Sequence, residues 1–340
     1  MKPLTERSNS FQIWLHSPWI IALFLTAVFF LVNGYIYGWD DQHLEIPLLK
    51  SLINPDLFAG DYYVESLKKN FPSFFYPILA KLISVEQIPA VYLTLFIISR
   101  YFFLFWTYKL WHHIAQDRFK AICCVLTFLY VLRVEEFLYR TFSHQEFTLA
   151  FVAAGLYYFF KERFVIAALI LGIGANFHAV YCLFPMLYIC FYLLWQVRKH
   201  GFSTLLKTGL TFTICAAPFI ATIIFNRLSP EQSLNGSSPD NWLPLFVRAC
   251  PQNFFFPDAP LVSLKRLWDR PETFFQYSRL YIYTLALFLV NLGLNESFRR
   301  NKKALSYCFV AILLVAVSFV FTQVYPNRFI LDLNLIRNRF

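Results

Sequence analysis

Charged residues are scarce in this chain. They make up 15% of its 340 residues, whereas 58% are hydrophobic, and an ordinary soluble domain carries about 25% charged residues. The composition therefore argues against a soluble protein and predicts a membrane protein. Inside a bilayer the backbone must satisfy its own hydrogen bonds, which it does in helices of about 20 mostly apolar residues.

Several features that would indicate other classes of protein are also absent. The sequence has no CxxC pair and no histidine-rich cluster, so it predicts no zinc site and no iron–sulfur cluster. Most of the seven cysteines fall inside apolar segments, which argues against a disulfide framework. The net charge of +10 comes from basic residues in short loops, so we expect no nucleic-acid partner. Without internal repeats or a soluble region, residues 1–340 are expected to form one membrane domain.

The apolar segments predict the fold class. We expect an all-α protein, a polytopic transmembrane helical bundle of about nine spans. The third to fifth spans are short, which is typical of helices that are broken or that line a polar cavity. Residues 324–340 begin another apolar helix, which is either truncated or interfacial. The predicted spans are residues 18–38, 88–109, 120–133, 146–160, 164–177, 178–196, 208–225, 279–295 and 304–322.

The distribution of charge predicts an orientation. With a cytoplasmic N-terminus, the short basic segments "WHHIAQDRFK", "KER", "VRKHGFSTLLK" and "FRRNKK" all lie on the cytoplasmic side, as the positive-inside rule requires. The first outer loop (39–87), the segment "RVEEFLYRTFSHQE" and a long loop (226–278) then face outward, with most of the 20 acidic residues. We expect a multi-pass protein of the plasma membrane, by default the inner membrane of a bacterium.

The first outer loop opens with "YGWDDQHLEIPLLKSLINPDLFAGDYY", residues 37–63. Asp40 or Asp41 is expected to cap a helix that follows, and Asp41 and Glu45 would share one of its faces. The later stretch "FPSFFYPILAKLIS" (71–84) contains two prolines and predicts a second interfacial or re-entrant segment. The first helix is expected to be amphipathic and to lie on the membrane surface, because of the spacing of Leu44, Leu48, Leu49, Leu52 and Ile53.

This layout resembles that of the GT-C superfamily of polytopic glycosyltransferases. A first helix that ends outward in an acidic pair, Asp40 and Asp41, is followed by interfacial helices and many short spans, and the likeness covers roughly the first 200 residues. It implies that the acidic pair is catalytic and that the donor is a polyprenyl-phosphate-linked sugar. The sequence has no WWD-type motif and no soluble C-terminal domain, which argues against a protein-glycosylating role.

The resemblance also implies a set of site residues. A lipid phosphate leaves with little help from an acid, so one carboxylate acting as general base on the acceptor hydroxyl is sufficient. Arginine can hold phosphate oxygens in a bidentate fork. No cofactor is required and no metal ligands are assigned, although carboxylates leave assistance by Mg²⁺ or Mn²⁺ open. The candidates for substrate binding are His43, Glu45, Arg100, Arg133, Arg140, His144 and His178.

Each candidate also has a structural interpretation. The acidic pair can serve only as a helix cap. The two outer arginines, Arg133 and Arg140, can be interfacial anchors neutralised by neighbouring glutamates, and the histidines can be structural. Arg100 lies near the middle of a span, where a charge is expensive, so it is either functional or half of a buried pair.

Two other functions compete with a glycosyltransferase. A transporter or flippase of a lipid-linked or polar solute would show inverted halves and charges at mid-membrane, and only Arg100 meets that expectation. A non-catalytic membrane scaffold would leave the outer acids without a common cavity. For the enzyme, the expected partners are the bilayer, the lipid-linked sugar and an acceptor that the sequence does not identify.

Overall fold

The computed structural model describes residues 17–39, 41–71, 73–130, 140–228, 286, 289–290, 292–294 and 296–320. Throughout these residues the regular elements are helices and no strand occurs, which confirms the all-α class. The chain divides into two compact units, which we describe separately. One consists of Met1–Met186 and Phe202–Ile224, and the other of Leu187–Gly201 and Phe225–Phe340.

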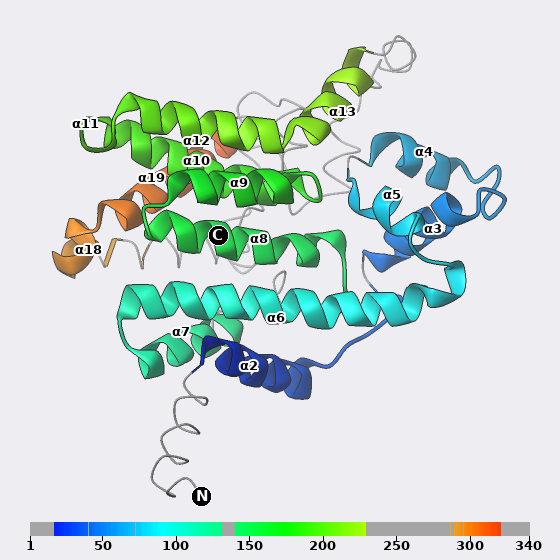
Figure 1. Ribbon diagram of the computed structural model, residues 1–340, viewed down its shortest axis with the longest axis horizontal. Coiled ribbons are helices and arrows are strands. Elements are labelled where there is room, and N and C mark those ends of the chain that lie inside the picture. Colours follow the sequence, from blue (N-terminus) through cyan, green and yellow to red (C-terminus); the bar gives the residue numbers. More distant parts are fainter. Residues whose placement is uncertain are drawn as a thin grey trace, which may run out of the picture. The chain divides into compact units, whose positions relative to one another are not determined.

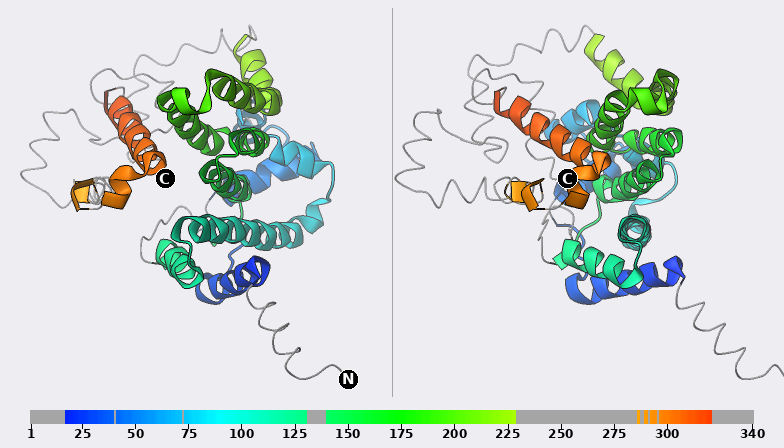
Figure 2. Two further views of the ribbon diagram at one scale, coloured as in Figure 1. Left: turned by 60° about the vertical axis from the view of Figure 1, so that its left-hand side comes forward. Right: turned by 90° about the vertical axis from the view of Figure 1, so that its left-hand side faces the viewer.

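The first unit is a series of packed helices built on α6 (Figures 1 and 2). The helices α2 and α7 pack on one side of α6 and α8 packs on the other, followed by α9 and then α12. Buried aromatic and aliphatic side chains fill the spaces between them, as the composition requires. The bounds are α2 Pro18–Asn33, α6 Ile88–Ala115, α7 Arg118–Tyr130, α8 His144–Phe160, α9 Phe164–Ala175 and α12 Phe202–Cys215.

One continuous helical stretch in the described residues is long and apolar enough to cross a membrane by itself. It is Val85–Ala115, formed by the 3₁₀ turn Val85–Gln87 and α6. Three shorter apolar helices are α2, α9 and α10 (Ala179–Trp195). The described part of the chain therefore does not establish the predicted number of spans, and about nine spans remain a prediction.

The predicted span at 208–225 was wrong as a single helix. The structure has α12 and α13 (Ala217–Leu228) instead, bent by 64° where they meet. Pro218 has no backbone N–H to continue the hydrogen bonds of α12, so the helix breaks there. The side chain of Asn176 stabilises the break, because its amide donates to the carbonyl of Cys215 at 2.9 Å and its oxygen accepts from the N–H of Phe219 at 3.2 Å.

The segment 39–87, predicted to be the first outer loop, forms three short helices, α3 (Gln42–Ile53), α4 (Tyr62–Asn70) and α5 (Phe75–Ala80). The predicted amphipathic helix is confirmed as α3, but its buried face differs from the apolar stripe: Leu44 is exposed and Glu45 is buried. The helix therefore carries a carboxylate into the interior of the unit. The sequence reasoning missed α4, which begins where Asp61 accepts hydrogen bonds from the N–H groups of Tyr63 and Val64.

Small residues allow neighbouring helices of the first unit to approach closely. A Cβ atom at Gly172 in α9 would lie 2.6 Å from Cβ of Cys215 and 2.8 Å from the backbone oxygen of Phe212, both in α12. Contacts this short force one helix to move, because the obstacle is partly backbone. Gly209 also lies in α12, but a Cβ atom added there would have no atom of a neighbouring segment within 4 Å.

We expect Gly172→Ala to lower the free energy of unfolding by about 1–3 kcal/mol through this overpacking. The matched control is Gly209→Ala, which should raise it by up to about 1 kcal/mol because alanine has the higher helix propensity. Chemical unfolding of the detergent-solubilised protein measures both. Equal effects of the two substitutions would show that α9 and α12 are not closely packed.

The second unit contains the end of α10, α11 (Val197–His200), α18 (Glu296–Arg300) and α19 (Lys302–Phe319). Aromatic pairs join α10 to α19, with ring centroids 4.2 Å apart for Tyr188 and Tyr307 and 5.0 Å apart for Phe191 and Phe309. The predicted span at 304–322 corresponds to α19. The predicted span at 279–295 falls mostly outside the described residues.

Candidate active site

The described parts of two predicted outer segments, 39–87 and "RVEEFLYRTFSHQE", meet the turn that follows α9 at one end of the first unit. The helices α3, α4 and α5 gather where α6 and α8 begin and α9 ends (Figure 1). Backbone and side-chain hydrogen bonds fix this arrangement: the N–H of Ile36 donates to the carbonyl of Arg140 at 2.7 Å, and the hydroxyl of Ser73 donates to the carbonyl of Phe177 at 2.7 Å. Segments separated by about 100 residues in the sequence are thus held together in space.

A buried group of three polar side chains forms the centre of this end. Glu45 extends from the buried face of α3, Tyr76 from α5, and His144 is the first residue of α8. The Nδ1 atom of His144 lies 2.8 Å from Oε1 of Glu45 and 3.0 Å from the hydroxyl of Tyr76. The side chain of Ser143 caps α8 by accepting from the following N–H groups, so the start of the helix, and with it His144, has a fixed position.

Burial controls the electrostatics of the group. It lowers the pKa of His144 to about 4, and the nearby carboxylate of Asp41 opposes this effect only in part. Burial also raises the pKa of Tyr76 well above its usual value, and the charge of Glu45 adds to that shift. At neutral pH the site therefore holds a neutral imidazole and a neutral phenol.

The neutral imidazole has one nitrogen that can accept a proton. With Glu45 ionised, Nδ1 of His144 must carry the hydrogen and donate it to the carboxylate, which leaves Nε2 unprotonated. Within the part of the chain that the structure describes, Nε2 makes no hydrogen bond. A carboxylate that orients a histidine in this way can make it a general base.

A second branch connects Asp41 with the two histidines. The amide of Gln145 donates to Oδ2 of Asp41 at 3.1 Å, and its oxygen accepts from the hydroxyl of Tyr181 at 3.1 Å. The ring of Tyr181 lies 4.3 Å from that of His178, which lies 5.1 Å from the ring of His144 (centroid distances). Asp41 occupies the N-cap position of α3 but does not cap it through its side chain, contrary to the predicted hydrogen bond. Its carboxylate is half-buried and contacts Gln145 instead.

The structure therefore brings together Asp41, Glu45, His144 and His178 of the predicted site residues. Arg100 is 1% exposed and pairs with Glu146, and its guanidinium lies 4.4 Å from the ring centroid of Phe29. This matches the interpretation of Arg100 as half of a buried pair. His43 and Arg140 are exposed. Asp40, Arg133, the tail 324–340 and all but the first three residues of the loop 226–278 lie outside the described residues.

Three members of the network were missed by sequence reasoning: Tyr76, Gln145 and Tyr181. The chain has 20 tyrosines, so a tyrosine in an apolar segment carries little information by itself. The sequence contained only a weak indication that Gln145 belongs to the site, namely its position between His144 and Glu146 at the start of a predicted span. Among the described residues, no group of three His, Cys, Asp or Glu side chains is placed to hold a metal ion.

Comparison of the chain with protein-family models, curated proteins and solved structures gave no match. The function of this chain must therefore be inferred from the site itself. Its main features are a buried Glu45–His144–Tyr76 group and a half-buried Asp41 that is connected to it through Gln145, Tyr181 and His178.

The pKa of His144 gives a prediction about stability. Because the pKa is lowered from 6.5 to about 4 in the folded protein, the unfolded chain takes up a proton first as the pH falls. Above pH 6.5 the ionisation of His144 should therefore cause no pH dependence of the free energy of unfolding. As the pH is lowered from 6.5 to 4, it should lower that free energy by up to about 1.4 kcal/mol per pH unit.

Unfolding of the detergent-solubilised protein at a series of pH values measures this dependence. In His144→Gln, the part of the slope that this residue causes should disappear, whatever the effect of the substitution at neutral pH. An identical slope in the variant and the wild type would contradict a neutral, buried His144.

Proposed function

We propose that this protein is a GT-C-like membrane glycosyltransferase that transfers a sugar from a polyprenyl-phosphate donor to an acceptor hydroxyl on the outer face of the membrane. One observation carries the proposal: Asp41, Glu45, His144 and His178, from segments far apart in the sequence, form one network at one end of a helical unit. Burying such groups is costly, and a cluster of titratable side chains with a shifted pKa is typical of a reactive site.

Asp41 is the residue best placed to act as general base. It is half-buried, whereas Glu45 is 2% exposed, so Asp41 can meet an acceptor without rearrangement of α3. In the proposed step Asp41 takes the proton of the acceptor hydroxyl while that oxygen bonds to the anomeric carbon of the sugar. The bond from this carbon to the phosphate oxygen breaks, and the lipid phosphate leaves with the electron pair.

The other residues of the network position and support Asp41. Gln145 fixes the orientation of its carboxylate through the 3.1 Å hydrogen bond. His144, oriented by Glu45, offers Nε2 as a second proton acceptor close to the same region. Arg140, exposed next to this end of the unit, and Arg133 are the proposed partners of the donor phosphate. No step is assigned to Mg²⁺ or Mn²⁺.

The proposal includes about nine spans, a cytoplasmic N-terminus and the plasma membrane. Two observations support this arrangement. The helix α6 is long and apolar enough to cross a bilayer. Its first residues lie near the acidic outer-loop helices, and its last residues belong to the basic segment "WHHIAQDRFK".

A transporter or flippase is the second candidate, and the buried Arg100–Glu146 pair favours it, because ionisable residues inside apolar helices often mark a transport path. A scaffold is the weakest candidate, because the outer acids Asp41 and Glu45 belong to one network. The two leading functions differ in whether a covalent bond of the donor breaks.

The test is a donor assay in reconstituted proteoliposomes. Polyprenyl-phosphate-linked sugars with a radiolabel in the sugar are offered singly, with simple alcohols and outer-membrane glycolipids as acceptors. If the protein is a glycosyltransferase, we expect release of polyprenyl phosphate and formation of a labelled acceptor product. Movement of intact donor between the leaflets without cleavage would reject the glycosyltransferase and favour the flippase.

A further inference from the structure

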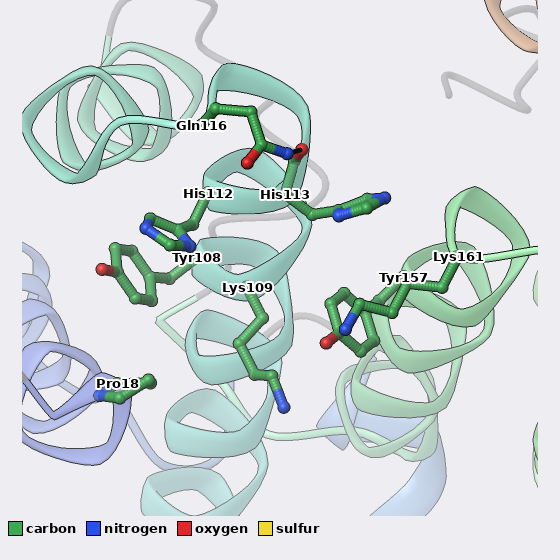
Figure 3. Close-up of a pocket in the computed structure, with 8 residues that line it drawn as sticks. All are labelled: Pro18, Tyr108, Lys109, His112, His113, Gln116, Tyr157 and Lys161. Carbon is green, nitrogen blue, oxygen red and sulfur yellow. Dashed lines mark hydrogen bonds between the residues drawn. The ribbon is translucent and has the colours of Figure 1, made fainter.

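A basic pocket lies at the end of the first unit that is remote from the Glu45–His144 group. Residues of the last turns of α6 and of the end of α8 line most of it (Figure 3). Its volume is about 140 Å³. One buried water needs about 10–15 Å³, so the pocket can hold a group of several atoms. Lys109, His112, His113 and Lys161 line it, and no carboxylate is among its lining residues.

The two lysines of the pocket are positioned by aromatic rings. The ammonium of Lys109 lies 4.8 Å from the ring centroid of Tyr157 and 4.7 Å from that of Trp106, and the ammonium of Lys161 lies 5.2 Å from the same Tyr157 ring. Figure 3 shows both lysines extending toward Tyr157 between α6 and α8. Cation–π contacts of this kind hold an ammonium in place without neutralising it.

Two further polar side chains that line the pocket contact backbone carbonyls. His113 extends from α6 toward α8, where its Nε2 lies 3.4 Å from the carbonyl of Phe160, and the side chain of Gln116 is anchored on the carbonyl of His113. Two positive charges close to one ring repel each other. A bound anion would offset this repulsion and would accept hydrogen bonds from the ammonium groups.

We propose that this pocket binds a phosphate group, with Lys109 and Lys161 as its principal ligands. The position of the pocket agrees with a phosphate at the membrane surface, because it surrounds the last turns of the helix that is long enough to cross a bilayer. Lysine side chains close to the membrane surface attract anionic lipid headgroups. The phosphate can come from an anionic lipid or from a soluble phosphate. The site does not depend on the proposed glycosyltransferase activity.

Binding is measured by microscale thermophoresis on the full-length protein in a neutral detergent. The probes are dihexanoyl phosphatidylglycerol, dihexanoyl phosphatidylcholine and inorganic phosphate. We expect the wild type to bind the anionic lipid more tightly than the zwitterionic one. Lys109→Gln and Lys161→Gln should each weaken that binding roughly tenfold, because each removes a charge-assisted hydrogen bond.

The matched control is Lys120→Gln, an exposed lysine near the start of α7 at the same end of the unit. It should leave binding unchanged. Because Lys161 is exposed, its variant should fold normally, which the thermal unfolding midpoint checks. Binding of inorganic phosphate without a preference between the two lipids would identify a soluble phosphate as the source, and a preference for the anionic lipid without binding of inorganic phosphate would identify a lipid headgroup. Absence of both, or equal loss in all three lysine variants, would overturn the proposal.

Discussion

Replacing Asp41 by asparagine is expected to lower donor turnover about 10²–10⁴-fold, the range that a general base contributes. The amide keeps the size of the side chain and can still accept the hydrogen bond from Gln145, so the network should persist. What it loses is the ability to take a proton from the acceptor hydroxyl. Initial rates in proteoliposomes, with the donor that the wild type uses, measure the effect.

The matched control is Asp56→Asn. Asp56 belongs to the same predicted outer loop but is exposed beyond the end of α3, so its variant should keep the wild-type rate. A thermal unfolding midpoint equal to that of the wild type checks that Asp41→Asn is folded. If Asp41→Asn turned over the donor at the wild-type rate, Asp41 would not be the base. The next candidates would be His144 and the neighbouring Asp40.

Replacing Arg100 by methionine is expected to lower the free energy of unfolding by about 3–5 kcal/mol. The side chains of Arg100 and Glu146 are 0% and 3% exposed, so the substitution leaves a carboxylate in the interior without its arginine. It also removes the contact of the guanidinium with the ring of Phe29. Chemical unfolding in detergent measures the loss.

A second substitution separates the ion pair from simple loss of packing. In the double variant Arg100→Met and Glu146→Leu, neither charge of the pair remains, and much of the lost stability should return. The exposed pair of Arg300 and Glu296 provides the comparison, because Arg300→Met should change stability by less than about 1 kcal/mol. Additive losses in the double variant would show that the charges at Arg100 and Glu146 do not depend on each other.

The buried pair also bears on the alternative function. If Arg100→Met with Glu146→Leu keeps both stability and donor turnover, the pair is structural. If the stable double variant loses turnover, the pair belongs to the reaction or to a path through the helices. The outcome therefore decides between the two interpretations that the sequence left open for Arg100.

The sequence alone determined the all-α class and the approximate start of many helices. Composition and apolar runs are local properties, and they predicted helices close to α6, α8 and α9. Spacing of apolar residues predicted α3 as a helix. Asp41, Glu45, His144 and His178 became candidates because they lie in segments that the charge distribution predicts to face outward.

Only the tertiary structure decided which of these residues meet. His144 and Glu45 are 99 positions apart in the sequence, and no local pattern encodes their contact. The orientation of α3 was also decided by packing, which buries Glu45 and exposes Leu44, because the partner of Glu45 is a histidine at the start of α8. The same holds for Arg100, whose burial is possible because α8 places Glu146 beside it.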